Sequence, residues 1–453
     1  MTLTIRNARP WGGPPVDLEI ADGRIAAIGP RLRSAQNNYD AGGAVLLPGL
    51  HDHHLHLLAT AARRESVSLA GLETADAVAA ALAAASGAHL RAVDYDERAA
   101  GLPDGAMLDR WVSDRPLRLQ DRTGALWVLN GAAMRLLEGQ ILPAGAERDE
   151  SGKPNGRFWR EDRWLGHALP GMMPDIVGLG RSLAALGLTG LTDAGANNGP
   201  QEAALLAAAG LPQRMVLMGR TDLPVGAGYR RGAVKLLIDE RDPPVLQTLA
   251  TTIGVARGQG RPVAAHCVTD AELALFLAAL DLAGGARAGD RIEHGGMIPA
   301  DFIPLIADKR LTVVTNPGFI YARGDRYFAM ISGECQCDLY RAASLAAAAV
   351  PIAGGSDAPY GSPDPWLAIR SAITRRSANG KILSSGEALD PRAALGLYLG
   401  EGLDPGGPER RIAVDTRADV VLCSGSIKDI LFDPDAGRVN ATFVAGALAF
   451  SRS

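Results

Sequence analysis

The segment Leu46–His56 constrains this chain more than any other, because it holds 4 of the 8 histidines of the protein. In a β-strand, alternate side chains point to the same side, so His54 and His56 would project together, about 7 Å apart along the backbone. Neutral imidazole is the commonest metal ligand among side chains and suits zinc. The segment therefore predicts one edge of a metal site at the end of an early strand. The alternative is a polar loop that is rich in histidine by chance.

Residues 50–400 alternate apolar runs of strand length with helical stretches rich in alanine and leucine. Repeated β-then-α units predict an α/β fold in which a parallel sheet closes into a (β/α)8 TIM-type barrel, with an open doubly wound sheet as the alternative. No Gly-x-Gly-x-x-Gly opens a helix after a strand, which disfavours a dinucleotide-binding fold. Besides the strand that holds His54, the predicted strands are 117–120, 189–192, 213–218, 233–238, 263–266, 290–294, 311–315 and 350–354.

Both ends of the chain read as short β-strands. Alternating segments flank the turn at Asp22-Gly23, a dipeptide typical of hairpins. Short segments with the pattern of β-strands also occur near the other end of the chain, at residues 418–423, 428–431 and 441–451. Because domain termini often lie close together, we predict that residues 1–49 and 400–453 form one small composite β-sandwich and that residues 50–399 form the barrel.

Polar residues stand near the ends of several predicted strands. Lys235 lies inside an otherwise apolar strand, His266 and His294 lie at or near the ends of the next two, and Asp357 follows a later one. Taken singly, a strand-end histidine usually makes a structural hydrogen bond, a lysine can reach solvent, and Asp357 can cap a turn. Taken together with His54 and His56, they predict a metal site, because the active residues of a barrel gather at the carboxyl ends of its strands.

This pattern resembles the amidohydrolase superfamily. The segment Pro48–His56 is similar to its signature Pro-Gly-hydrophobic-x-Asp-x-His-x-His. Lys235 is placed like the lysine of strand four in that family, His266 and His294 like the histidines of strands five and six, and Asp357 like the aspartate of strand eight. The resemblance covers nearly the whole chain and is specific for fold and metal, but it says little about the substrate.

Within the superfamily, the chain most resembles amidohydrolase family three, the branch of the N-substituted formamide deformylases. The supporting segments are 187–195, 232–235, 355–359 and 418–422. Two departures fall where substrate loops are expected: Gly124 is followed by Ala125 where relatives often have histidine, and the region 58–109 is short. The substrate of that branch therefore does not carry over.

The resemblance implies a binuclear metal centre. Lys235 would be carboxylated by CO2, and the carbamate would bridge two divalent metal ions, with zinc as the default and manganese, cobalt or iron open. His54, His56 and Asp357 would hold the more buried ion, and His266 and His294 the more exposed one. A metal-activated hydroxide would attack the carbonyl of an amide, formamide or cyclic amide, and Asp357 would pass its proton to the leaving nitrogen. Asp52 would orient a ligand histidine without binding a metal ion itself.

Other functions remain open at this point. A deaminase with one metal ion would not need Lys235, and a non-catalytic regulatory protein could bind metal without turnover. A metal-free lyase or isomerase would leave four histidines and a buried lysine unexplained. Arg323 and Arg326, after the seventh strand, could bind a substrate anion, although we interpret both as solvated surface.

The composition and net charge disfavour several classes of binding partner. The net charge of -4 gives no basic field that would attract nucleic acid or anionic lipid. Arg6, Arg9 and Asp17 interrupt any apolar segment at the start, and no later apolar run reaches about 18 residues, so we expect a soluble cytoplasmic protein with no membrane partner. The 4 cysteines are too few for a secreted disulfide framework. Cys335 and Cys337 are interpreted as structural or incidental. We expect a small-molecule substrate, and homo-oligomer formation stays open.

Overall fold

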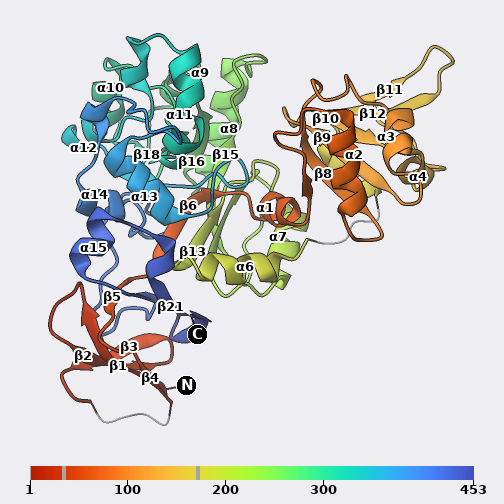
Figure 1. Ribbon diagram of the computed structural model, residues 1–453. Helices are drawn as coiled ribbons and strands as arrows, with labels where there is room; N and C mark the ends of the chain where they lie inside the picture. The colour runs from red at the N-terminus through yellow and green to blue at the C-terminus, as the bar shows by residue number, and fades with distance from the viewer. Residues whose placement is uncertain (1, 33–36, 170–173, 453) are drawn as a thin grey trace. The chain divides into compact units, whose positions relative to one another are not determined.

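The structure is a computed structural model that describes residues 2–32, 37–169 and 174–452. The chain forms two compact units, and the second is inserted into the sequence of the first (Figure 1). The first unit comprises Met1–Leu57 and Ile176–Ser453, and the second comprises Leu58–Asp175.

The first unit contains the predicted parallel barrel. Within the described residues, its eight strands are hydrogen bonded in the order β19-β18-β17-β16-β15-β14-β13-β6, and neighbours run parallel. The Asp357 N–H donates to the His54 carbonyl and the His56 N–H donates to the Ala358 carbonyl, so the segment after the last strand closes the barrel against the first. The strands are β6 (Leu50–Leu55), β13 (Leu188–Asp193), β14 (Arg214–Gly219), β15 (Arg230–Leu236), β16 (Val263–Cys267), β17 (Arg291–His294), β18 (Thr312–Thr315) and β19 (Ile352–Gly354).

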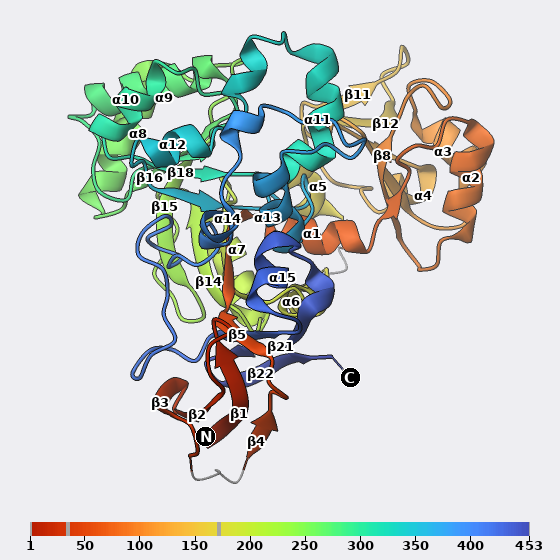
Figure 2. The same cartoon turned by 60° about the vertical axis from the view of Figure 1, so that its left-hand side comes forward.

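Helices pack on the outside of these strands (Figure 2). Strand residues that contact these helices face outward, and the residues that alternate with them face the inside of the barrel. Val234 and Leu236 of β15 pack in one buried cluster with Ile253 and Phe276 of two outer helices. Because strand residues alternate, the intervening Lys235 points into the barrel. The helices of this unit are α6 (Ile176–Ala184), α7 (Pro200–Ala208), α8 (Leu246–Gly258), α9 (Asp270–Leu282), α10 (Phe302–Asp308), α11 (Gly318–Met330), α12 (Ala343–Ala347), α13 (Pro365–Thr374), α14 (Pro391–Gly396) and α15 (Ile427–Phe432).

A second sheet of this unit is built from both ends of the chain, as predicted (Figure 1). Its order is β22-β21-β20-β5-β1-β2-β3, with β4 paired to β1. Residues 428–431 were predicted as a strand but lie in α15, because Ser426 and Asp429 form a capping box that starts a helix there. The strands are β1 (Thr2–Pro10), β2 (Val16–Ala21), β3 (Arg24–Gly29), β4 (Asn38–Asp40), β5 (Val45–Pro48), β20 (Val420–Cys423), β21 (Val439–Val444) and β22 (Ala447–Ser451).

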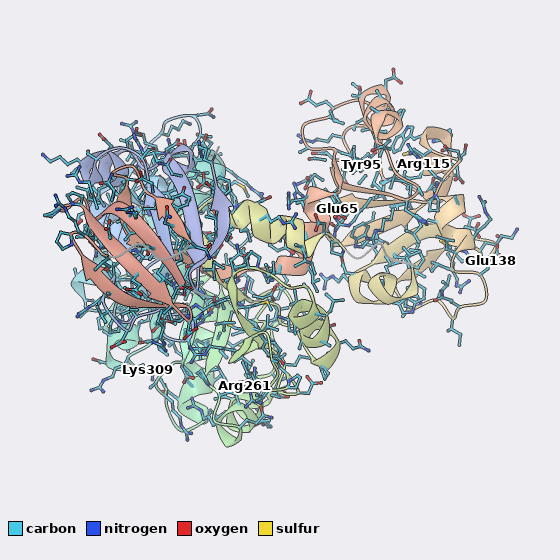
Figure 3. The ribbon with its side chains drawn as sticks, turned by 90° about the horizontal axis from the view of Figure 1, so that it is seen from below. Glu65, Tyr95, Arg115, Glu138, Arg261 and Lys309 are labelled. Atoms are coloured by element: carbon cyan, nitrogen blue, oxygen red, sulfur yellow. The ribbon has the colours of Figure 1, made fainter. Side chains whose placement is uncertain are left out.

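The inserted unit has its own sheet, in the order β11-β12-β10-β9-β8-β7. Residues 117–120, predicted as a barrel strand, lie here in β9, which pairs antiparallel with β10 and so has no place in a parallel barrel. Tyr95 and Arg115 belong to this unit and donate to backbone carbonyls within it (Figure 3). Its elements are β7 (Val67–Ser68), β8 (Leu90–Tyr95), β9 (Leu117–Asp121), β10 (Leu126–Leu129), β11 (Ala146–Arg148), β12 (Pro154–Trp159), α2 (Ala75–Ala84), α3 (Gly105–Trp111), α4 (Gly131–Arg135) and α5 (Asp162–Ala168), with α1 (Leu57–Arg64) beginning at its boundary.

Over the residues that the structure describes, no helix combines the length and the apolar character that crossing a membrane requires.

Candidate metal centre

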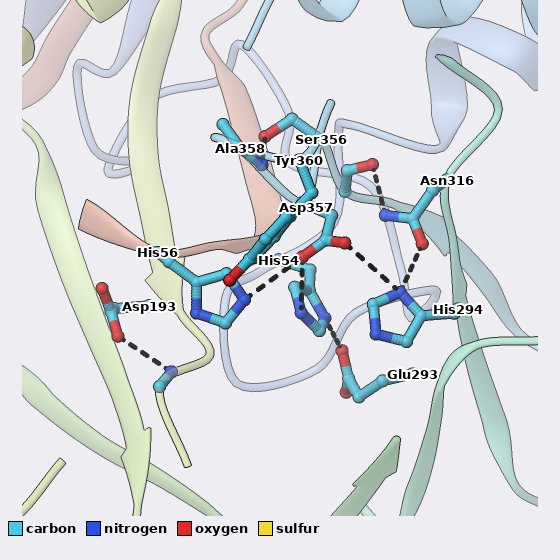
Figure 4. Close-up of polar contacts among 12 residues, drawn as sticks. His54, His56, Asp193, Glu293, His294, Asn316, Ser356, Asp357, Ala358 and Tyr360 are labelled. Carbon is cyan, nitrogen blue, oxygen red and sulfur yellow. Dashed lines mark hydrogen bonds and ion pairs between the residues drawn. The ribbon is translucent and has the colours of Figure 1, made fainter. Parts of the chain in front are cut away.

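Three of the predicted ligands meet where the barrel closes. His54 ends β6 together with Leu55, His56 follows that strand, and Asp357 follows β19. The Nε2 atoms of His54 and His56 lie 3.5 Å and 3.2 Å from Asp357 Oδ1 (Figure 4). The possible ligand atoms of the three residues all lie within 4.8 Å of one another, which is the spacing that one shared ion requires. His54 is fully buried, whereas the His56 side chain is 25% exposed.

The other three predicted ligands line the same cavity. This cavity has a volume of about 600 Å³, and its wall includes Lys235, His266 and His294 beside His54. The ring of His294 lies 4.6 Å from the ring of His266 and 4.6 Å from that of His54, centroid to centroid. The structure therefore brings all six predicted residues to one cavity at the carboxyl ends of the strands.

Lys235 is buried, and its Nζ finds no hydrogen-bond partner among the described residues. Burial lowers the pKa of this amine. An unpaired ammonium inside a protein is unfavourable. The amine of Lys235 is therefore either neutral or bonded to another group. The arrangement fits a lysine that carries a carbamate between metal ions.

The protonation states suit a divalent cation. Burial lowers the pKa of His54, His266 and His294, so their rings are neutral, which is the form that binds metals. Burial alone would raise the pKa of Asp357, but the nearby His294 and His56 lower it below its ordinary value. Neutral imidazoles and one carboxylate are therefore present together near neutral pH.

Hydrogen bonds fix the rings of two of these histidines (Figure 4). Glu293 contacts His54 Nδ1, and Glu293 is itself paired with Arg291 at 2.5 Å. His294 Nδ1 donates to Asn316 Oδ1 at 2.8 Å, while Asn316 Nδ2 donates to the Gly355 carbonyl at 2.8 Å. With Nδ1 protonated in both rings, Nε2 of each is left with the lone pair that binds a metal.

Glu293 and Asn316 were not predicted from the sequence. The signal for Glu293 was present, since Arg291 and Glu293 flank Ile292, which packs in the buried cluster with the outer helices, and this alternation places both charged residues inside the barrel. Asn316 follows β18 by one residue and carries no pattern that distinguishes it from a turn residue.

Asp52 was expected to orient a ligand histidine. It accepts the backbone N–H of His54 at 3.1 Å and that of Ser356 at 3.0 Å, so it holds the main chain of two site segments together. The ring of His54 is held by Glu293 instead. Burial raises the pKa of Asp52 to about 6.

The two remaining histidines of β6, His51 and His53, lie away from the cavity. His51 and His53 stack on each other with centroids 4.5 Å apart, and His51 Nε2 lies 2.8 Å from Thr192 Oγ1. Neither residue lines the cavity.

Comparisons with known proteins agree with this geometry. The model of a family described as "Amidohydrolase family" matches residues 38–450. YtcJ of Bacillus subtilis (strain 168), a protein assigned to the amidohydrolases, is 25% identical over 419 residues, which cover 79% of each chain. An uncharacterized metal-dependent hydrolase from Pyrococcus furiosus has a similar structure, with a TM-score of 0.73 and 20% identity over 94% of this chain and 100% of that one. A counterpart from Pyrococcus horikoshii OT3 has a TM-score of 0.74 and 18% identity over 97% of this chain and 100% of that one. At these identities the two structures show a shared fold.

Proposed function

The chain belongs to the amidohydrolase family of metal-dependent hydrolases, and we propose that it hydrolyses the carbon–nitrogen bond of an amide, a formamide or a cyclic amide. The observation that carries the proposal is the cavity in which neutral histidines and Asp357 meet a buried Lys235 whose amine has no hydrogen-bond partner among the described residues.

We assign the predicted residues to two metal positions. His54, His56 and Asp357 would hold one divalent ion, and His266 and His294 a second, with zinc as the default. The carboxylated Lys235 would help to hold both ions, because its neutral amine can react with CO2 and a carbamate would supply two anionic oxygens. Ions bound there would lower the pKa of water to about 7 and polarise the substrate carbonyl.

The protein side chains would supply the remaining steps. Asp357 is an ionised carboxylate beside the site, so it would accept the proton of the attacking water and donate it to the leaving nitrogen. Glu293 and Asn316 would keep the rings of His54 and His294 in one orientation and one tautomer throughout the reaction. Side chains that are held in position before the substrate binds are typical of enzyme active sites.

A deaminase with a single metal ion is the second candidate. It is favoured by one observation: within the described residues, the tight group of potential ligands contains only His54, His56 and Asp357. Such an enzyme would have no need of Lys235, so the metal content of a Lys235 variant separates the two candidates.

The test is elemental analysis of protein purified without chelator, together with an activity screen. We expect close to two divalent ions per chain and hydrolysis of at least one member of a panel of formamides, N-acyl amino acids and hydantoins, with lactones as a comparison. His54→Ala should lose metal and activity, whereas His53→Asn, a change at a buried histidine of the same strand outside the cavity, should keep both. Metal near zero after supplementation would refute the proposal.

A further inference from the structure

Two arginines of α11 line the cavity above the predicted ligands. From the sequence we interpret Arg323 and Arg326 as solvated surface, but both belong to the cavity wall. Among the described residues, neither forms an ion pair with a carboxylate. The positions of their guanidinium groups therefore need another explanation.

Within the part of the chain that the structure describes, the contacts that hold the Arg323 guanidinium are with neutral groups. Its guanidinium lies over the ring of Phe319, 3.8 Å from the centroid, and its Nη2 donates to the Tyr360 carbonyl at 3.0 Å. The ring of Tyr360 in turn meets that of His56 edge to face, with centroids 5.8 Å apart (Figure 4). Arg323 is thus half-buried and tied to the segment that carries Asp357, while most of its N–H donors remain available to a ligand.

The charges of the cavity wall are unbalanced. In the described part of the chain, the wall carries the cationic side chains of Arg323 and Arg326, against the single carboxylate of Asp357. Divalent ions would add further positive charge. The rest of the wall is mainly apolar and includes Phe319, Met330 and Ile331. A neutral or cationic substrate would leave these guanidinium groups without a partner, whereas an anion on a hydrocarbon frame would match both features.

We propose that the substrates are amides that carry a carboxylate beside an apolar group, such as N-acyl amino acids, and that Arg323 binds the carboxylate. This inference rests on the proposed amide hydrolysis. The planar guanidinium matches a carboxylate through two parallel N–H···O bonds, and stacking on Phe319 fixes its plane. Arg326 is exposed, so water screens its charge and it contributes less.

The test uses substrate pairs that differ only by the carboxylate. N-formylphenylalanine, as both enantiomers, is compared with N-formylphenethylamine, and N-acetylleucine with N-acetylisoamylamine. We expect the wild-type protein to favour the carboxylate member in kcat/KM by about 10- to 100-fold, the value of one charge-assisted bidentate contact. In Arg323→Gln this ratio should fall by the same factor, and Arg323→Lys should keep part of it.

Arg326→Gln is the matched control, because it removes the same charge from the same helix at an exposed position. Its ratio should change by less than about threefold. An unchanged ratio in Arg323→Gln would overturn the inference, as would a wild-type protein that hydrolyses the neutral members equally well. Phosphonate analogues of the same amino acids show whether the site prefers a carboxylate to another anion, and a preference for the phosphonate would also overturn it.

A binding measurement separates this inference from the proposed function. Titration calorimetry compares 3-phenylpropionate with 3-phenylpropanol on the metal-loaded protein and on Arg323→Gln. If no amide is hydrolysed, the proposed function fails, but a carboxylate affinity that drops about 10-fold or more in Arg323→Gln still supports the anion site. Equal affinity in the two proteins would overturn the site whatever the hydrolysis result.

Discussion

Glu293 offers a sharp test of how the metal centre is organised. Its carboxylate is fully buried inside the barrel, where it contacts His54 Nδ1 and pairs with Arg291. Replacing it by methionine keeps a side chain of similar length but removes both the charge and the acceptor. We expect Glu293→Met to lose stability and metal affinity together, for two separable reasons.

The stability loss comes from Arg291, whose side chain is 5% exposed and would keep its charge without its carboxylate partner. Removing one member of a buried pair typically costs about 3–5 kcal/mol. The loss of metal affinity comes from His54, whose ring would no longer be held in one orientation and tautomer. Losing such a partner of a metal-binding histidine typically weakens binding by about 10- to 100-fold.

A double variant separates the two effects. Arg291→Met with Glu293→Met replaces the ion pair by two apolar side chains, and such replacements are often neutral or stabilising. Stability should therefore recover, while metal affinity should stay as weak as in the single variant. Urea denaturation of the metal-free proteins measures the first quantity, and competition with a chromophoric chelator measures the second.

Asp290→Asn is the control for a general loss of stability. Asp290 pairs with Arg257 at 3.0 Å in an equally buried position, immediately before β17 and outside the set of predicted ligands. It should cost stability without changing metal affinity. If Glu293→Met kept wild-type metal affinity, or if Asp290→Asn lost as much, Glu293 would have no role in positioning His54.

Three further expectations concern other parts of the molecule. Lys235→Ala should lose metal and several orders of magnitude of activity, with partial recovery in concentrated acetate or propionate that replaces the carbamate; full activity and full metal content would favour the one-metal deaminase. His266→Ala should keep one ion and lose the other, which elemental analysis reports. Ellman's reagent should titrate the exposed Cys335 and Cys337 in the native protein and the buried Cys267 and Cys423 only after unfolding, and four fast thiols would contradict the packing.

The barrel strands from residue 188 onward could be predicted because their apolar runs repeat, with a helix between most neighbouring strands. The strand at residues 117–120 looked the same in sequence, since alternation reports a half-buried strand but not the sheet to which it belongs. Its antiparallel partner follows after a short turn closed by Asp121, whose side chain accepts the N–H groups of Thr123 and Leu126. That turn was the overlooked sign of a hairpin, and a hairpin is incompatible with a parallel barrel.

The contact between His54 and Glu293 could not be predicted in the same way, because 239 residues separate them and only the layering of the closed barrel brings them together. The sequence does contain a set of charged residues at unexpected positions. Lys235, Arg291 and Glu293 each interrupt a strand that is expected to be apolar. A charged side chain inside a barrel is unfavourable unless a partner compensates it. Arg291 and Glu293 compensate each other, and Glu293 also holds His54, but Lys235 has no partner within the described protein. The uncompensated Lys235 is therefore the member of the set that supports our proposal of a metal-bound carbamate at this position, and the compensated pair Arg291 and Glu293 holds the neighbouring His54 in place.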